Sequence, residues 1–162
     1  MTVEQRNEAS IITKPAFQAV GIKWEGTYAE AGAGGIRAIH EQLQERLAEI
    51  PYAIHKDTML GLSYHAHPGA EGFTHYATVE VEKVGDIPEG MVAIAVPELT
   101  YATCHHAKQQ NIQQSYTNVY NWIREQGYQE KAPDGLTHLE QYPMEQDPYD
   151  DQPEFVIMIP VE

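Results

Sequence analysis

The sequence predicts an α+β fold, in which a strand, helix, strand, strand unit occurs twice and forms one antiparallel sheet with both helices on one face. Apolar and polar residues alternate in several short segments, as in half-buried strands, and apolar residues recur at helical spacing in two longer ones. These patterns follow one another in the same order in both halves of the chain. Such a sheet leaves its opposite face, or a central groove where the halves meet, available for a ligand.

The first half begins with a strand and a helix. Ala16–Trp24 has the two-residue alternation of a strand, and the apolar residues of Ile36–Ile50 lie on one helical face. Pro51 ends this helix because proline cannot continue it. Two further short runs, Met59–Tyr64 and His75–Lys83, are joined by a loop that contains glycine and are predicted to be strands.

The second half repeats this order. Met91–Tyr101 is predicted to be a strand and Ile112–Gln126 a helix that stops at Gly127, and two more strands follow over Leu136–Tyr142 and Glu154–Val161.

A shift along the chain that takes Phe17 onto Ile94 also superimposes the other elements, although residue identities are not kept. We therefore expect a single domain over residues 1–162, with pseudo-repeats at about 15–85 and 90–162 that complete one hydrophobic layer together.

Composition and charge limit the functions that this chain can have. It has 162 residues, of which 24 are acidic and 10 basic, so its net charge of -14 disfavours direct binding of nucleic acid. The longest apolar runs are only as long as a strand, and the first ten residues do not resemble a signal peptide. The single cysteine cannot form an internal disulfide. We expect a soluble cytoplasmic protein that contacts neither a membrane nor nucleic acid directly.

Several segments, in order and at compatible spacing, carry a resemblance to a known family. They are the strand-to-helix passage from Gly90 through Ala102, the helix residues from Tyr116 to Tyr128, the pair Glu140 and Tyr142, the closing strand Phe155–Pro160 and, more loosely, Phe17–Gly21 with Phe73, Tyr76 and Val81. Over nearly the whole chain the sequence resembles the GyrI-like small-molecule-binding domains. These form the effector-binding half of several multidrug-responsive transcription regulators of the AraC and MerR types.

The resemblance implies a duplicated domain whose central groove binds amphipathic, often cationic or aromatic, molecules, with a glutamate corresponding to Glu140 meeting the positive charge. Some similar proteins stand alone and hydrolyse cyclopropane-bearing alkylating compounds with the equivalent glutamate. Only about fifteen residues precede the first predicted strand, too few for the helix-turn-helix module of the regulators. We therefore expect a stand-alone binding protein rather than a DNA-binding regulator.

Independently of this resemblance, the residue types around Glu140 favour a ligand site. His138, Glu140 and Tyr142 share one face of a predicted internal strand, because alternate residues of a strand point the same way. A carboxylate among aromatic rings loses hydration, and such a site favours a positively charged guest or proton uptake. A strand residue paired with a neighbour at the surface is the alternative for Glu140.

Four further residues are candidates for ligand contact. Tyr76 alternates with buried positions and is expected to face away from the helix-covered layer toward the groove. Trp122 lies beside the apolar stripe of the second helix, and Tyr101 and His105 share a face if their strand extends that far. Core or edge packing is the alternative for each of them.

Three functions remain open: capture of a hydrophobic cation or similar compound, hydrolysis with Glu140 as general base, and binding of a protein partner by the acidic surface. Cys104 is not expected to be a nucleophile. No metal is expected at His65 and His67, which lie at a loop mouth, and no cofactor at the glycine-rich entrance Gly32–Gly35. The acidic segment Pro143–Glu154 is a solvated loop or a lid.

Overall fold

A computed structural model describes residues 5, 7–67 and 69–162 of the chain. Its eight strands form one sheet in the order β1-β6-β8-β7-β3-β4-β2-β5, and the neighbouring strands are antiparallel. The strands are β1 (Ala9–Lys14), β2 (Phe17–Gly26), β3 (Thr58–Tyr64), β4 (Phe73–Val81), β5 (Val92–Val96), β6 (Leu99–His106), β7 (Leu136–Pro143) and β8 (Phe155–Pro160). The two long helices are α2 (Ile36–Arg46) and α3 (Ile112–Glu125).

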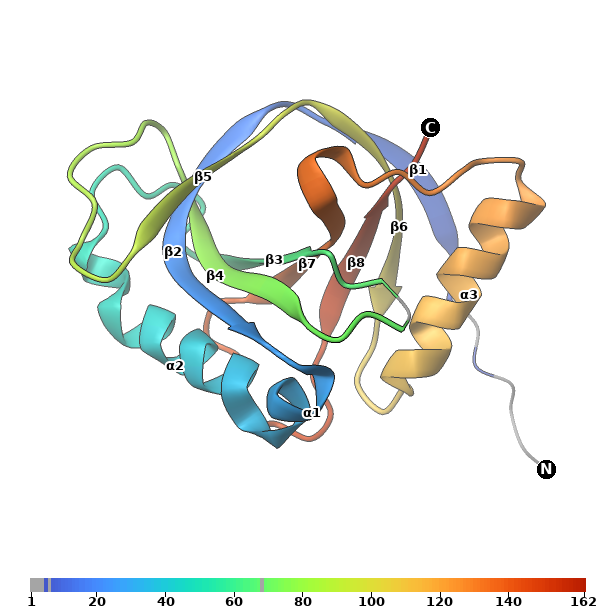
Figure 1. The fold of residues 1–162 in the computed structure, drawn as a ribbon, viewed down its shortest axis with the longest axis horizontal. Helices are drawn as coiled ribbons and strands as arrows, with labels where there is room; N and C mark the ends of the chain where they lie inside the picture. Colours follow the sequence, from blue (N-terminus) through green and yellow to red (C-terminus); the bar gives the residue numbers. More distant parts are fainter. Residues whose placement is uncertain (1–4, 6, 68) are drawn as a thin grey trace.

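The α+β class, the antiparallel sheet and the two helices predicted from the sequence are confirmed. The sheet is strongly curved, and α2 and α3 lie on its outer side (Figure 1). The order strand, helix, strand, strand occurs as β2, α2, β3, β4 and again as β6, α3, β7, β8. No helix in the described part of the chain has both the length and the apolar character needed to cross a membrane.

Two details of the predicted strands were wrong. Met91–Tyr101 is not one strand, because the chain leaves the sheet between Val96 and Leu99 and continues as β6 on the other side of the molecule. Pro97 lies at the break and has no backbone N–H to contribute to a ladder. The second difference is β1, a strand that the sequence analysis did not predict. It precedes the first predicted strand and pairs with β6 at the sheet edge.

Each helix covers its own half of the outer face. Ile39 and Leu43 of α2 pack with Val20, Ile22 and Val79 on β2 and β4. On the other half, Val119 and Ile123 of α3 pack with residues of β6 and β8, among them Cys104 and Ile157. Helix α3 starts where the Asn111 side chain accepts a hydrogen bond from the Gln114 N–H at 2.8 Å. The apolar stripes read from the sequence therefore lie against the sheet.

The inner, concave face of the sheet has a separate core. It contains Leu60, Leu62, Tyr101, Leu139 and Met158, which alternate along their strands with residues of the helix-covered face. The sheet thus has apolar cores on both faces, and the space between α2 and α3 lies on the outer face.

A short irregular segment leads into α2. Helix α1 (Tyr28–Glu30) begins with a capping box, in which Thr27 and Glu30 each accept a hydrogen bond from the other's backbone N–H. One π-helical turn, η1 (Ala31–Gly35), then joins α1 to α2. Within it Gly34 has a φ of 113°, a conformation that favours glycine.

Candidate functional site

Glu140 lies near the middle of the sheet on the face that the helices cover. Its partners on the two strands that flank β7 are Gly61 on β3 and Ile157 on β8. Glu140 Oε1 accepts a hydrogen bond from the Tyr142 hydroxyl at 2.7 Å, and Oε2 accepts one from the Tyr116 hydroxyl of α3. Only 9% of Glu140 is exposed. Its carboxylate is therefore held by two phenol groups in a largely desolvated position.

Both phenols keep their protons at neutral pH. Burial raises the pKa of Tyr116 and of Tyr142 well above the usual value, and the negative charge of Glu140 raises both further. Among the described residues Glu140 forms no ion pair with a lysine, arginine or histidine. Two neutral donors satisfy the carboxylate, and no lysine or arginine in the described part of the chain forms an ion pair with it.

Gly61 has no side chain and so leaves room for this arrangement. A Cβ at this position would lie 3.0 Å from the His75 ring and 3.5 Å from the Tyr142 ring. Glycine therefore lets both rings lie close to the sheet beside Glu140.

Two histidines, His40 and His75, lie near the carboxylate on the side of α2. His40 Nε2 and His75 Nε2 lie 3.2 Å apart, and His75 Nδ1 is 2.9 Å from the Ser63 hydroxyl oxygen. The His40 ring lies edge-on to the Tyr142 ring, with 5.1 Å between the ring centroids. Burial lowers the pKa of His40 to about 4, although Glu140 opposes this, and burial lowers the pKa of His75 well below its usual value. Both imidazoles are neutral at pH 7.

Two more histidines lie on the side of α3. The His138 ring meets the Tyr116 ring edge-on at 5.3 Å, and His106 Nδ1 is 2.7 Å from the Ser115 hydroxyl oxygen. Burial lowers the pKa of both imidazoles. His138 Nδ1 and His106 Nε2 are buried and have no hydrogen-bond partner among the described residues.

A cavity of about 420 Å³ opens beside Glu140 between α2 and the loop that joins β7 to β8, and Ile112 at the start of α3 also lines it. Its lining combines the polar groups Glu140, Tyr142 and His40 with apolar side chains such as Met59, Ile36 and Phe155. Arg37 is its one lysine or arginine, against three acidic residues, Glu140, Asp147 and Asp150. The arrangement can enclose a small molecule with apolar surface beside a buried negative charge.

The loop between β7 and β8 forms one side of this cavity and is attached to the body of the protein at several points. Gln44 of α2 donates hydrogen bonds to the carbonyls of Met144 and Gln146, at 2.8 and 2.7 Å. From the other side, Lys108 pairs with Asp150 at 3.0 Å. The loop thus bridges α2 and the segment before α3.

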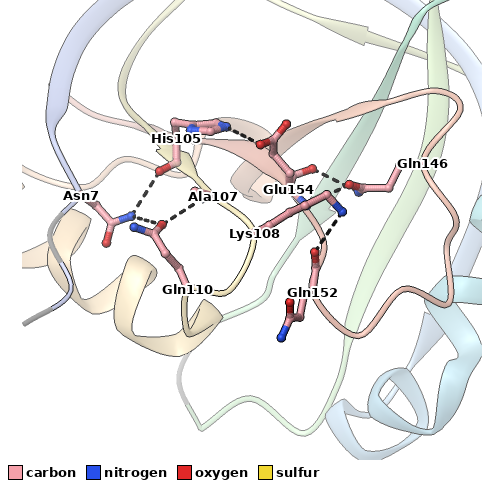
Figure 2. Close-up of polar contacts among 8 residues, drawn as sticks. All are labelled: Asn7, His105, Ala107, Lys108, Gln110, Gln146, Gln152 and Glu154. Atoms are coloured by element: carbon pink, nitrogen blue, oxygen red, sulfur yellow. Dashed lines mark hydrogen bonds and ion pairs between the residues drawn. The ribbon is translucent and has the colours of Figure 1, made fainter. Parts of the chain in front are cut away.

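Figure 2 shows the contacts around the base of this loop. His105 Nε2 lies 3.5 Å from a Glu154 carboxylate oxygen, and Gln146 accepts a hydrogen bond from the Glu154 N–H at 2.9 Å. Asn7 donates to the His105 carbonyl at 3.2 Å. Residues from three distant parts of the sequence therefore meet at this edge of the site.

The structure brings together only part of the predicted site. Glu140 and Tyr142 both line the cavity, and His138 shares their face of β7. Tyr76 lies on the opposite, concave face beside Tyr64, with ring centroids 5.5 Å apart. Tyr76 does face away from the helix-covered layer, but the cavity next to Glu140 lies within that layer.

The other three candidates also lie away from this cavity. Tyr101 is fully buried in the concave core, and Trp122 is half-buried against the core beneath α3 and stacks on Tyr128, with ring centroids 6.4 Å apart. β6 does extend to His105, which is exposed and contributes to a smaller hollow beside Tyr142. A ligand role for Tyr76, Tyr101, Trp122 or His105 stays a prediction.

Sequence reasoning did not select Tyr116, His40 or His75 for the site. Tyr116 recurs at helical spacing with Val119 and Ile123, a pattern typical of core packing, but its hydroxyl reaches Glu140. His40 lies between Ile39 and Leu43 on the buried face of α2. A histidine among the apolar residues of a helix face is the signal that could have identified His40, since a buried polar group requires a partner.

The surroundings of the single cysteine and of the histidines are as follows. Cys104 is buried, and burial raises the pKa of its thiol to about 11, so it is protonated at neutral pH. In the described ranges no three histidine, cysteine or acidic side chains are grouped as metal ligands would be.

Solved structures share this fold along nearly its whole length. The C-terminal domain of EcmrR has a TM-score of 0.72 at 16% identity, and the match covers 98% of this chain and 99% of that domain. SAV2435, solved bound to tetraphenylphosphonium, has a TM-score of 0.68 at 18% identity, with 96% and 94% of the two chains covered. At these identities the likeness establishes the fold.

Two further comparisons differ in what they cover. In the EcmrR–DNA complex the match has a TM-score of 0.70 at 16% identity and covers 96% of this chain but 57% of the EcmrR chain. A hydrolase from Listeria innocua has a TM-score of 0.57 at 8% identity, with 96% and 92% covered. No curated protein sequence matched.

A family model settles the relationship that the fold and the site suggest. The model of the GyrI-like small-molecule-binding domain matches residues 7–162, which is nearly the whole chain. The chain belongs to the GyrI-like small-molecule-binding domain family.

Proposed function

We propose that this protein binds bulky organic cations in the cavity between α2 and the β7–β8 loop, with Glu140 as the counter-charge. The observation that carries the proposal is the buried Glu140 carboxylate, which two tyrosine hydroxyls hold and no cationic side chain of the described residues pairs with. A desolvated charge without an ionic partner is costly, so a bound cation is favoured there.

The surroundings of the carboxylate favour a cation with a large apolar surface. Such an ion gives up little hydration on entering, whereas a small, strongly hydrated ammonium loses much more. Tyr142, Met59 and Phe155 offer apolar contact in the cavity, which contributes about 25 cal/mol per Å² of buried surface. A cation over a ring face gains a further ~0.5–2 kcal/mol.

Two independent facts agree with this ligand class. The chain's net charge of -14 attracts cations from a distance. The structural neighbour SAV2435 was solved with tetraphenylphosphonium, a bulky cation of this kind. The neighbour supports the proposal by analogy of fold, at 18% identity.

Calorimetric titration with a matched pair of probes tests the role of Glu140. Methyltriphenylphosphonium carries a positive charge, and triphenylphosphine oxide presents three phenyl rings without one. For Glu140→Gln we expect affinity for the cation to fall by about tenfold or more, and affinity for the neutral probe to change less than about threefold. Glu145→Gln removes an exposed carboxylate outside the cavity and serves as control.

An equal loss for both probes, or the same loss in the Glu145→Gln control, would contradict the proposed counter-charge. The predicted hydrolase is tested in the same preparation with a cyclopropane-bearing electrophile followed by mass spectrometry. A gain of one water by many substrate molecules per protein would establish hydrolysis instead. Recovery of the electrophile unchanged, with the phosphonium bound, supports a binding protein.

A further inference from the structure

Gly32 contributes backbone without a side chain to the lining of the cavity. This residue lies in the π-helical turn η1 that joins α1 to α2, and it lines the cavity next to Ala31 and Ile36. Glu140 and Tyr142 belong to the same cavity. Gly32 is exposed, and a side chain at position 32 would extend from the lining of this cavity into open space, where a large one can compete with a ligand.

The fold does not require glycine at this position. Gly34 has a φ of 113°, and a Cβ on Gly35 would lie 2.7 Å from the Trp24 ring nitrogen, so both neighbours have structural reasons to be glycine. A Cβ on Gly32 would meet no described atom within 4 Å, and its φ lies outside the range that favours glycine. Among the chain's twelve glycines, all in the described part, Gly32 alone combines these two properties.

Glycine in a helical turn also has a cost. It destabilises a helix relative to alanine because the unfolded chain loses more backbone freedom on folding. Neither backbone conformation nor close packing offsets this cost at Gly32. The space that the missing side chain leaves in the cavity is the remaining explanation.

We propose that Gly32 determines ligand size, by leaving room beside η1 for cations that carry several rings. This inference rests on the proposed function, because it concerns the same cavity. A large side chain at position 32 would fill part of a space of about 420 Å³ and would exclude a four-ring ion before a one-ring ion.

The test compares wild type, Gly32→Ala, Gly32→Phe and Ala33→Phe by calorimetric titration. Ala33 is the matched control, since it lies in the same turn and is exposed as Gly32 is, but does not line the cavity. The probes are tetraphenylphosphonium and benzyltrimethylammonium, which carry four rings and one. Melting temperatures without ligand show whether each variant is folded.

For Gly32→Phe we expect affinity for tetraphenylphosphonium to fall at least about tenfold and affinity for benzyltrimethylammonium to change less than about threefold. Ala33→Phe should bind both cations as wild type does. Gly32→Ala should melt at a higher temperature than wild type and lose less affinity for the large cation than Gly32→Phe.

The two proposals fail in different ways. If Gly32→Phe binds tetraphenylphosphonium as tightly as wild type, or if Ala33→Phe weakens it equally, Gly32 does not set ligand size although the cavity binds cations. A lower melting temperature for Gly32→Ala would likewise contradict the inference, since the fold would then need this glycine. If wild type binds neither cation, the proposed function itself is wrong and the size role with it.

Discussion

At the scale of single residues, the centre of the site is a carboxylate held by two hydroxyl donors. Tyr116 reaches Glu140 from α3, and Tyr142 reaches it from two positions along the same strand. Hydrogen bonds to charged groups contribute more to stability than bonds between neutral groups, and leaving a buried charge without its donor costs the most. These two tyrosines therefore contribute to the stability of the protein and, in the proposed function, to its preference for cations.

Removing the Tyr142 hydroxyl tests this contribution. We expect Tyr142→Phe to lower the free energy of unfolding by about 1.5–3 kcal/mol, because Glu140 then lacks one donor. Urea denaturation measures the change. Tyr52→Phe removes the hydroxyl of an exposed tyrosine and should change the free energy of unfolding by less than about 0.5 kcal/mol. Equal stability of the two variants would show that the bond to Glu140 contributes nothing.

The buried histidine pair predicts how stability depends on pH. The pKa of His40 is lowered to about 4 in the folded protein, and that of His75 is lowered too, against about 6.5 in an unfolded chain. Below pH 6.5 the unfolded state therefore binds more protons than the folded state. The free energy of unfolding should fall as the pH is lowered from about 6.5 to 4, by up to about 1.4 kcal/mol per pH unit for each histidine.

Urea denaturation at a series of pH values measures this slope, and His40→Gln provides the comparison. Glutamine does not titrate, so the slope between about pH 6.5 and 4 should be shallower in this variant than in wild type. A slope that the substitution leaves unchanged would mean that His40 does not bind a proton on unfolding in this range.

At the scale of elements, periodicity located most strands and both long helices, and its failures have physical causes. The edge strand β1 contains Ile11 and Ile12 side by side and lacks the alternation of a half-buried strand. The break at Pro97 separates β5 from β6, although apolar residues continue on both sides of it. A pattern of apolar residues does not show where a strand leaves its sheet.

The same limit applies to the site. Strand alternation placed Glu140 and Tyr142 on one face, and both line the cavity. It could not show which face of the sheet carries the cavity, and Tyr76 therefore lies on the other side from Glu140. Nor could it show that Tyr116 of α3 meets Glu140, because the pairing of a helix with a strand depends on packing across the whole domain.

The loop between β7 and β8 is the element whose attachment can be tested most simply. Gln44→Ala removes the donor to the carbonyls of Met144 and Gln146, and amide hydrogen exchange across residues 144–154 should become faster. Gln42 lies on α2 two residues before Gln44 and is exposed. Gln42→Ala is therefore the control and should leave exchange as in wild type. Unchanged exchange in Gln44→Ala would mean that the loop is held mainly from the side of Lys108.

At the scale of the whole molecule, the curved sheet and its charge act together. The sheet carries one apolar core within its curve and two helices on its outer face (Figure 1), where a cavity of about 420 Å³ lies between α2 and the β7–β8 loop. The net charge of -14 attracts cations to the whole molecule, and the four histidines with lowered pKa values, His40, His75, His106 and His138, lie on the helix-covered side of the sheet. In the proposed function, this long-range attraction acts together with the Glu140 carboxylate in the cavity.

A crystal structure of the protein grown with tetraphenylphosphonium tests the proposed binding site most directly. We expect the cation between α2 and the β7–β8 loop, with its phosphorus within about 6 Å of a ring face of Tyr142 and its phenyl groups against Gly32. The carboxylate of Glu140 should be the nearest negative charge. A cation bound on the concave face beside Tyr76, or bound anywhere without contact to the cavity that Glu140 lines, would contradict the proposed site.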